Sequence, residues 1–176
     1  MSDMRLTRLR AQLVVGLLVV SAAVVVVVAV TRDSQADASA GRGCPPGAVL
    51  VNTDLPQDAA DVTLRVLNGT GTAGLADRVS TEFGERGFRM QAPGKSTISY
   101  DQVAVVRYGP RTVGAAQWIR AHFLGAAEPR YSPERNTDVI DVVVGARYQQ
   151  LATFTEVNQS MAQLSEPDLP PGACAA

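Results

Sequence analysis

The segment whose residue types most clearly suggest chemistry is a glycine-rich loop that reads NGTGTAG. Glycines between a strand and a helix let backbone N–H groups approach an anion at the positive end of the helix. No Gly-Lys-Ser/Thr follows, and the G-x-G-x-x-G spacing is not kept in the internal repeat described below. A tight turn in which a threonine caps the helix is therefore favoured over a ligand site. The candidate contacts in this loop are Asn68, Gly69, Thr70 and Gly71.

Two arginines and a tyrosine at the end of a later strand form a second candidate contact. Arg107, Tyr108 and Arg111 could grip a polyanion or a carboxylated sugar, with the tyrosine ring as a stacking surface. The competing interpretation, which we favour, is a solvated strand end.

The sequence offers no group of side chains suited to catalysis or to holding a metal ion. His122 is the only histidine, and without a second ligand or a suitable carboxylate it is expected to be a partly exposed helix residue. Asp138 and Asp141 flank a strand without forming a carboxylate pair, and no Ser or Thr lies in a nucleophile-elbow context. We therefore expect a protein that is not an enzyme and binds no cofactor. A small envelope hydrolase, the alternative, would depend on His122.

The two cysteines are expected to form a disulfide bond. Cys44 and Cys174 each lie beside a Pro-Pro-Gly sequence, in rigid non-helical tails that bracket the folded part. There is no Cys-x-x-Cys spacing, which disfavours redox catalysis. Closing so long a loop would stabilise the fold by roughly 5 kcal/mol on the chain-entropy model.

The elements that position these residues follow from the hydrophobic pattern. Strands are expected at residues 62–67, 88–90, 102–108 and 138–144. A helix follows the first strand and another, at about 113–124, follows the third. Their apolar stripes are Ala76, Val79 and Phe83, and Ala116, Ile119 and Phe123. A short strand near 130–131 and a terminal helix within 149–164 are further candidates.

An internal repeat organises the domain. Shifting the sequence by forty residues aligns six identical residues within eighteen positions, from Val66 with Val106 to Phe83 with Phe123. Two tandem βαβ units most simply fold as a βαββαβ sandwich, an α/β (α+β two-layer) fold in which two helices cover one face of a four-stranded sheet. A pseudo-twofold axis would send the loops after the two repeated strands to opposite edges. A flavodoxin-like parallel sheet is the alternative, disfavoured because the chain allows too few strands.

The N-terminal region predicts a membrane anchor. Residues 11–30, Ala11 to Val30, carry no charge and would span a bilayer core as a helix. Three arginines precede this run, so the positive-inside bias keeps residues 1–10 in the cytoplasm as a tail. Residues 31–43 are then a flexible spacer, and residues 44–176 an extracytoplasmic domain closed by the disulfide. A signal peptide cleaved near the sequence ADASA is the alternative.

The charge of the part beyond the anchor argues against nucleic acid as a partner. From residue 31 onward the chain has sixteen acidic and thirteen basic side chains, without a basic stripe. Affinity for nucleic acid comes mainly from basic groups that neutralise phosphates. We therefore expect no nucleic-acid partner.

Three stretches of the sequence resemble the LytR C-terminal domain family. They are VTLRVLNGTGTAGLADRVSTEFGERGFRM at residues 62–90, VAVVRYGP at 103–110 and DVVVG at 141–145. The resemblance implies a domain outside the bacterial cytoplasmic membrane, often found behind a LytR-CpsA-Psr catalytic domain that attaches wall glycopolymers to peptidoglycan. This chain has no room for such a catalytic domain, so glycopolymer transfer is not implied.

Stand-alone members of the family imply a non-catalytic role in keeping the actinobacterial envelope intact. The first hypothesis is therefore an anchored module that contacts the cell membrane through residues 11–30 and binds an envelope protein or a wall polymer. The alternative is an accessory subunit that presents a wall glycopolymer to a separate ligase. Its contacts would be Arg107, Tyr108, Arg111 and the NGTGTAG loop.

Overall fold

The computed structural model describes residues 16, 18–22, 44, 46–164 and 166–176. The chain divides into two units, Met1–Cys44 and Pro45–Ala176, and each is described by itself. The predicted cytoplasmic tail and spacer lie outside the described residues, as does most of the predicted anchor, of which residues 16 and 18–22 are helical. Within the described part of the chain, no helix has the length and apolar character needed to cross a membrane.

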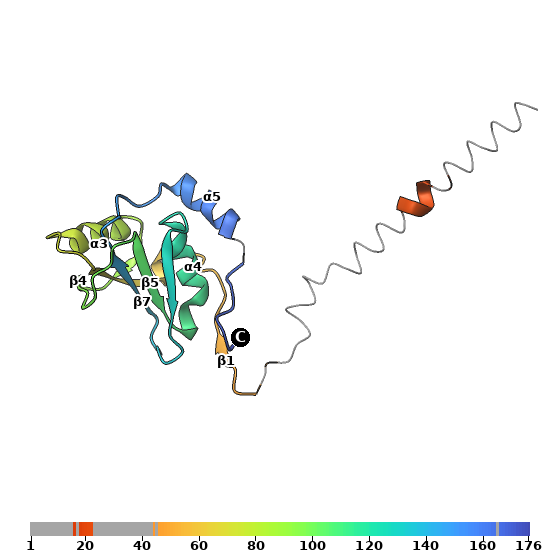
Figure 1. Ribbon diagram of the computed structural model, residues 1–176, viewed down its shortest axis with the longest axis horizontal. Coiled ribbons are helices and arrows are strands. Elements are labelled where there is room, and N and C mark those ends of the chain that lie inside the picture. Colours follow the sequence, from red (N-terminus) through yellow and green to blue (C-terminus); the bar gives the residue numbers. More distant parts are fainter. Residues whose placement is uncertain (1–15, 17, 23–43, 45, 165) are drawn as a thin grey trace, which may run out of the picture. The chain divides into compact units, whose positions relative to one another are not determined.

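The second unit has the mixed α/β class that the hydrophobic pattern predicts (Figure 1). Its main sheet is built from β2 (Thr63–Asn68), β3 (Arg89–Met90), β4 (Gly94–Lys95), β5 (Ala104–Tyr108), β6 (Ala127–Tyr131) and β7 (Val139–Val144). The helices are α3 (Leu75–Glu85), α4 (Val113–Ala121) and α5 (Phe154–Leu164), with short 3-10 helices at Ala59–Asp61 and Pro110–Thr112. The strand order is β3-β2-β7-β5-β6, and β4 also pairs with β2. A separate small sheet joins β1 (Val49–Val51) in parallel to β8 (Ala173–Ala175).

The predicted tandem of two βαβ units is confirmed. β2, α3 and β3 form the first unit, and β5, α4 and β6 form the second, each with its two strands parallel. β7 is parallel to β2 and antiparallel to β5. The loops that follow β2 and β5 therefore leave opposite ends of the sheet, as the pseudo-twofold arrangement predicts.

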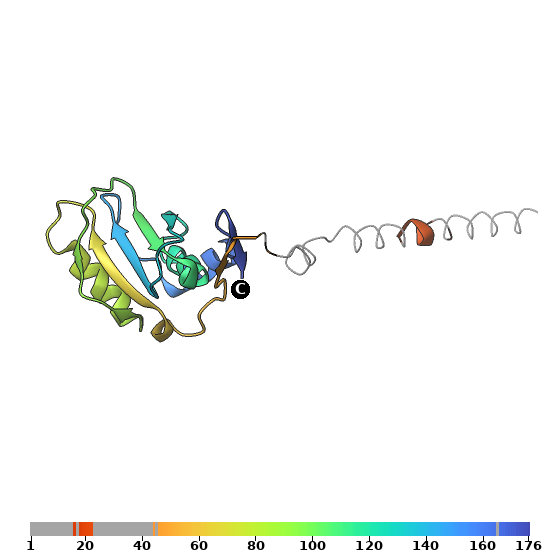
Figure 2. The same cartoon turned by 90° about the horizontal axis from the view of Figure 1, so that it is seen from below.

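The predicted four-stranded βαββαβ sheet is wrong in its number of strands and in the strand that closes the second unit. The strand expected to close the second unit is β7, and it lies instead between the two units, in blue between yellow β2 and green β5 in Figure 2. β7 suits this central place because Ile140 and the three following valines are buried on both faces of the sheet. The second unit is closed by β6, whose Pro129 and charged residues are typical of an edge strand.

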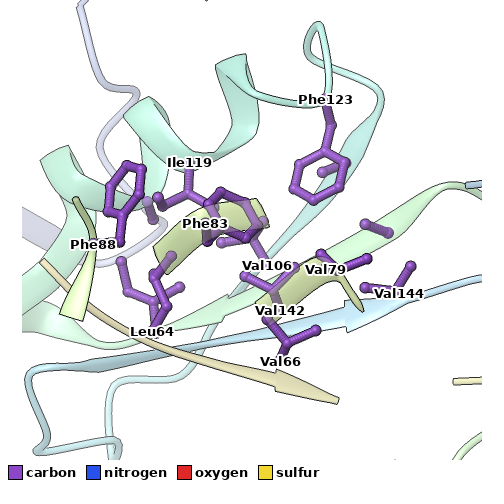
Figure 3. Close-up of a cluster of buried hydrophobic side chains, with 14 of the residues drawn as sticks. Leu64, Val66, Val79, Phe83, Phe88, Val106, Ile119, Phe123, Val142 and Val144 are labelled. Carbon is purple, nitrogen blue, oxygen red and sulfur yellow. The ribbon is translucent and has the colours of Figure 1, made fainter. Parts of the chain in front are cut away.

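The core lies between one face of the main sheet and the helices α3 and α4. The apolar stripes of both helices join the inward side chains of β2, β5 and β7 in a single buried cluster (Figure 3). Phe83 of α3 is fully buried at its centre. Both predicted stripes are confirmed, so the helices take their places because their apolar residues recur on one side.

Residues with a positive φ angle lie at both ends of α3 and shortly after the end of α4. α3 begins after Gly74 (φ 70°) and stops before Gly87 (φ 91°), a conformation that glycine adopts without steric cost. α4 ends at Ala121, three residues before the predicted end, and Leu124 (φ 53°) and Gly125 (φ 77°) then turn the chain toward β6. Leu124 is the one residue other than glycine with a positive φ in the described part of the chain.

The predicted disulfide is present. Both Cys44 and Cys174 are disulfide-bonded, and the chain has only these two cysteines. Cys174 lies in β8, in register with Leu50 of β1.

Candidate functional site

The face of the main sheet opposite α3 and α4 carries a row of charged side chains. Arg65 of β2 lies in register with Asp141 of β7, Asp141 with Arg107 of β5, and Arg107 with Arg130 of β6. Side chains alternate along a strand, so the sequence neighbours of each of these residues point to the opposite face, which the helices cover. With Arg135, which lies before β7, these residues form what we call the arginine row: Arg65, Arg107, Arg130, Arg135 and Asp141.

Asp141 is the buried centre of the arginine row. Its side chain is 4% exposed and accepts two hydrogen bonds from Arg65, Nε at 2.8 Å and Nη2 at 3.0 Å. The Nη2 atom of Arg135 lies 2.9 Å from Oδ2, the oxygen that also accepts from Nη2 of Arg65, and it donates to the carbonyl of Val139 as well. The hydrogen bonds to Asp141 raise the pKa of Arg65 above its usual value. One buried carboxylate thus fixes two guanidinium groups.

Arg107 adds a positive charge without a matching acid. It is half-buried, and no other described residue forms an ion pair or side-chain hydrogen bond with it. Arg130 pairs with Glu128 at 2.9 Å, and Tyr100 donates its hydroxyl to the same carboxylate. These hydrogen bonds lower the pKa of Glu128 and keep it ionised. Arg65, Arg107, Arg130 and Arg135, taken together with Asp141 and Glu128, carry a net charge of +2.

The structure separates Arg107 from its two predicted companions. Tyr108 points to the helix-covered face, where it is buried and its ring centroid lies 5.8 Å from that of Tyr131. Arg111 is exposed, pairs with Asp138 at 3.0 Å and lines a separate cleft of about 260 Å³. The predicted three-residue contact is therefore wrong, because adjacent strand residues face opposite sides of the sheet.

The NGTGTAG loop is held together by its own hydrogen bonds. The side-chain oxygen of Asn68 accepts from the N–H and hydroxyl of Thr70, and its Nδ2 donates to the carbonyl of Thr72. Thr70 in turn accepts from the N–H of Thr72. The tight-turn interpretation is supported, but the predicted threonine cap is wrong, because the N-cap residue of α3 is Gly74 and no side chain caps the helix. The candidate contacts of this loop thus serve the turn, and the loop lies at the opposite end of the sheet from Gly109.

Gly69 and Gly71 of this loop are expected to respond differently to alanine. A Cβ on Gly69 would lie 2.9 Å from both Cγ1 of Val143 and the carbonyl oxygen of Val144, whereas a Cβ on Gly71 meets nothing within 4 Å. Gly69→Ala should lower the free energy of unfolding by about 1–3 kcal/mol, as overpacking does, and Gly71→Ala should change it by less than about 0.5 kcal/mol. Urea denaturation of both variants measures this, and equal losses would contradict the close approach at Gly69.

His122 is buried, which corrects the expectation of a partly exposed residue. It is 2% exposed and packs beside the rings of Phe83, Phe88 and Trp118, at centroid distances of 5.3 to 6.1 Å. Its Nδ1 lies 3.0 Å from the carbonyl oxygen of Trp118, and because a carbonyl oxygen only accepts, Nδ1 is the donor of this bond. Burial lowers the pKa of His122 from 6.5 to about 4, opposed by the bond to Trp118. Aromatic neighbours and a helix carbonyl make it a core residue.

Burial of His122 predicts a loss of stability in mild acid. Its pKa is about 4 in the folded chain and about 6.5 when unfolded. Between these values the unfolded state binds more protons, so stability is full above pH 6.5 and falls by about 3 kcal/mol as the pH drops to 4. Urea titrations across this range should show the fall for the natural chain and a flatter profile for His122→Gln. Identical pH slopes for the two proteins would contradict the assignment.

The chemistry available at the arginine row is anion binding. Guanidinium groups match planar carboxylates and phosphates with two parallel hydrogen bonds. Asp141 is unsuited to act as a base because both its oxygens already accept from arginines. Among the described residues there is also no cluster of three His, Cys, Asp or Glu side chains that could hold a metal ion.

Sequence reasoning identified Arg107 and missed the other arginines of the row. The available signal was a charged residue inside an apolar strand: Arg65 within VTLRVL and Asp141 within DVIDVVV. Such a residue must find a partner on the second face of the sheet. The identity of that partner depends on strand order, which the sequence pattern did not provide.

Comparison with known proteins identifies relatives of this domain. A family model described as LytR cell envelope-related transcriptional attenuator matches residues 61–148, which are 88 of the 176 residues. No curated protein sequence matches the chain. Among solved structures, the soluble domain of a conserved hypothetical secreted protein from Mycobacterium marinum is similar, with a TM-score of 0.51 and 23% sequence identity. The alignment covers 66% of this chain and 84% of that one. This likeness supports the same fold.

Proposed function

Since its family model matches half of the chain, the protein belongs to the LytR C-terminal domain family, and we propose that it is a non-catalytic module that supports the integrity of the cell envelope. Its domain lies on the outer side of the cytoplasmic membrane, anchored through residues 11–30. There it binds wall polymer or other envelope proteins. The family match and the apolar N-terminal run support this proposal.

The observation that carries the binding role is the arginine row. Surface arginines are normally solvated or paired one to one with acids. Here three guanidinium groups share two carboxylates on one sheet face, and the fourth, that of Arg107, has no acid partner among the described residues. Such a surface attracts anions and offers them fixed hydrogen-bond donors. Binding without chemistry is the function that these groups support, because the one buried acid among them is held by two arginines.

Complementation in the source bacterium tests the envelope role. A strain that lacks the gene is expected to become more permeable to a fluorescent dye, and the full chain should restore the barrier. A chain without residues 1–30, given a cleavable signal peptide, should restore it less well because it is no longer held at the membrane. A deletion strain with normal permeability and normal growth under wall stress would refute the proposal.

Topology and partners are tested separately. Alkaline phosphatase fused after Ala176 is expected to be active, since that enzyme folds only outside the cytoplasm; an inactive but stable fusion would refute the extracytoplasmic placement. Crosslinking of the anchored protein in cells should capture wall polymer or envelope proteins. Repeated capture of a glycopolymer ligase together with its polymer would favour the accessory-subunit alternative.

A further inference from the structure

We propose that the arginine row binds an acidic glycan that carries a carboxylate on each sugar and lies across the strands of the main sheet. This inference rests on the proposed envelope function and names its ligand class. The residues that contact the glycan are Arg65, Arg107 and Arg130, one each from β2, β5 and β6.

The arginines of the row outnumber the carboxylates beside them, and the described residues supply no further anion to balance the positive charge. Asp141 is already shared by Arg65 and Arg135. Glu128 is engaged by Arg130 and Tyr100. Arg107 stands between these two groups, half-buried and without a partner among the described side chains. A half-buried guanidinium without an acid partner is a favourable contact for a ligand carboxylate, which can accept two hydrogen bonds from Arg107.

The spacing of the row favours a polymer with regularly placed carboxylates. Neighbouring strands are about 5 Å apart, so Arg107 and Arg130 are separated by one strand spacing and Arg65 and Arg107 by about twice that distance. These steps are close to the length of one and of two sugar units in an extended chain. A glycan that crosses the strands therefore brings successive carboxylates to successive arginines. Arg107, which has no side-chain partner among the described residues, can take a carboxylate through two parallel hydrogen bonds. Arg65 and Arg130 offer the N–H groups that Asp141 and Glu128 leave free.

Two guanidinium groups of the arginine row are already held in place in the unbound protein. Arg65 and Arg135 are held by Asp141, with side chains 42% and 21% exposed, so their position costs little further entropy on binding. Tyr100 lies beside the same face: its N–H donates to the carbonyl of Gly69 and its hydroxyl to Glu128. The ring of Tyr100 thereby borders the path of the glycan and offers a surface for a sugar.

Binding of a defined oligosaccharide to the full chain in detergent micelles tests this inference. The probe is a hexamer of galacturonic acid, and its fully methyl-esterified form is the matched neutral control. Calorimetry should show saturable binding of the acid form that weakens as salt increases, and no binding of the ester. Arg107→Gln should weaken binding about tenfold or more, while Arg78→Gln, an exposed residue of α3 with the same charge change, should stay within about twofold.

A second variant separates charge from geometry. Arg107→Lys keeps the positive charge and loses the planar fork, so its affinity should lie between those of the natural chain and Arg107→Gln. Equal weakening by Arg78→Gln, or equal affinity for the methyl ester or for tripolyphosphate, would overturn the inference. A folded chain that binds no acid hexamer but still restores the envelope barrier would overturn this inference alone. If the chain binds the hexamer but a strain that lacks the gene keeps a normal envelope barrier, the proposed function is overturned instead.

Discussion

Asp141→Ala is expected to lower the free energy of unfolding by about 3–5 kcal/mol, the usual cost of removing one partner of a buried ion pair. The carboxylate is 4% exposed and receives Arg65 at 2.8 Å and Arg135 at 2.9 Å. Without it, two guanidinium groups lose their counter-charge on a partly dehydrated sheet face. Urea denaturation followed by circular dichroism measures the loss.

Asp138→Ala is the matched control for this prediction. Asp138 lies three residues earlier and also pairs with an arginine, Arg111 at 3.0 Å, but the two side chains are 66% and 57% exposed. Exposed pairs contribute about 0–1 kcal/mol, so this variant should be nearly as stable as the natural chain. If Asp141→Ala cost no more than Asp138→Ala, Asp141 would not be the group that holds the arginine row.

Phe83→Ala is expected to have a similarly large effect, about 3–5 kcal/mol, through the cavity it leaves in the core. Phe83 is fully buried and its ring centroid lies 5.5 Å from that of Phe88 and 6.1 Å from that of Phe123. Figure 3 shows it between α4, at Ile119, and the sheet, at Val106. Loss of its ring removes contacts with both βαβ units at once.

Phe154→Ala removes the same side chain at an exposed position and serves as the control. Phe154 begins α5, is 69% exposed, and has Arg86 5.6 Å from its ring centroid. An exposed cation–π contact is worth about 0.5–1 kcal/mol, so a small loss is expected. Thermal unfolding of the two variants should differ by several degrees; coincident midpoints would contradict the central place of Phe83 in the core.

The arginine row also shows how overall charge can conceal a local one. The chain has a formal net charge of −1, which argues against an extended basic surface that binds nucleic acid. Yet four arginines and two acids meet on one face of the sheet. Composition averages over the whole chain, whereas binding depends on the charges within about a Debye length of the ligand, roughly 10 Å at ordinary salt. A small, ordered anion site is therefore compatible with an acidic chain.

The sequence by itself determined the local architecture of this protein. The forty-residue repeat predicted both βαβ units, and the apolar stripes that contain Phe83 and Phe123 identified the sides of α3 and α4 that face the core. These features succeed because helix and strand periodicity are properties of neighbouring residues. The Pro-Pro-Gly tails likewise pointed to the pairing of Cys44 with Cys174, since the chain holds no other cysteine.

Only the tertiary structure decided which strands are neighbours, and with them the site. Insertion of β7 between β2 and β5 places Asp141 beside both Arg65 and Arg107, which are 42 positions apart in the sequence. Periodicity predicts which side of a strand a residue occupies, but the order of strands depends on long-range burial. β7, whose Ile140 and three valines are buried on the two faces of the sheet, gains most at the centre, while β6, with its proline and charges, is tolerated at the edge.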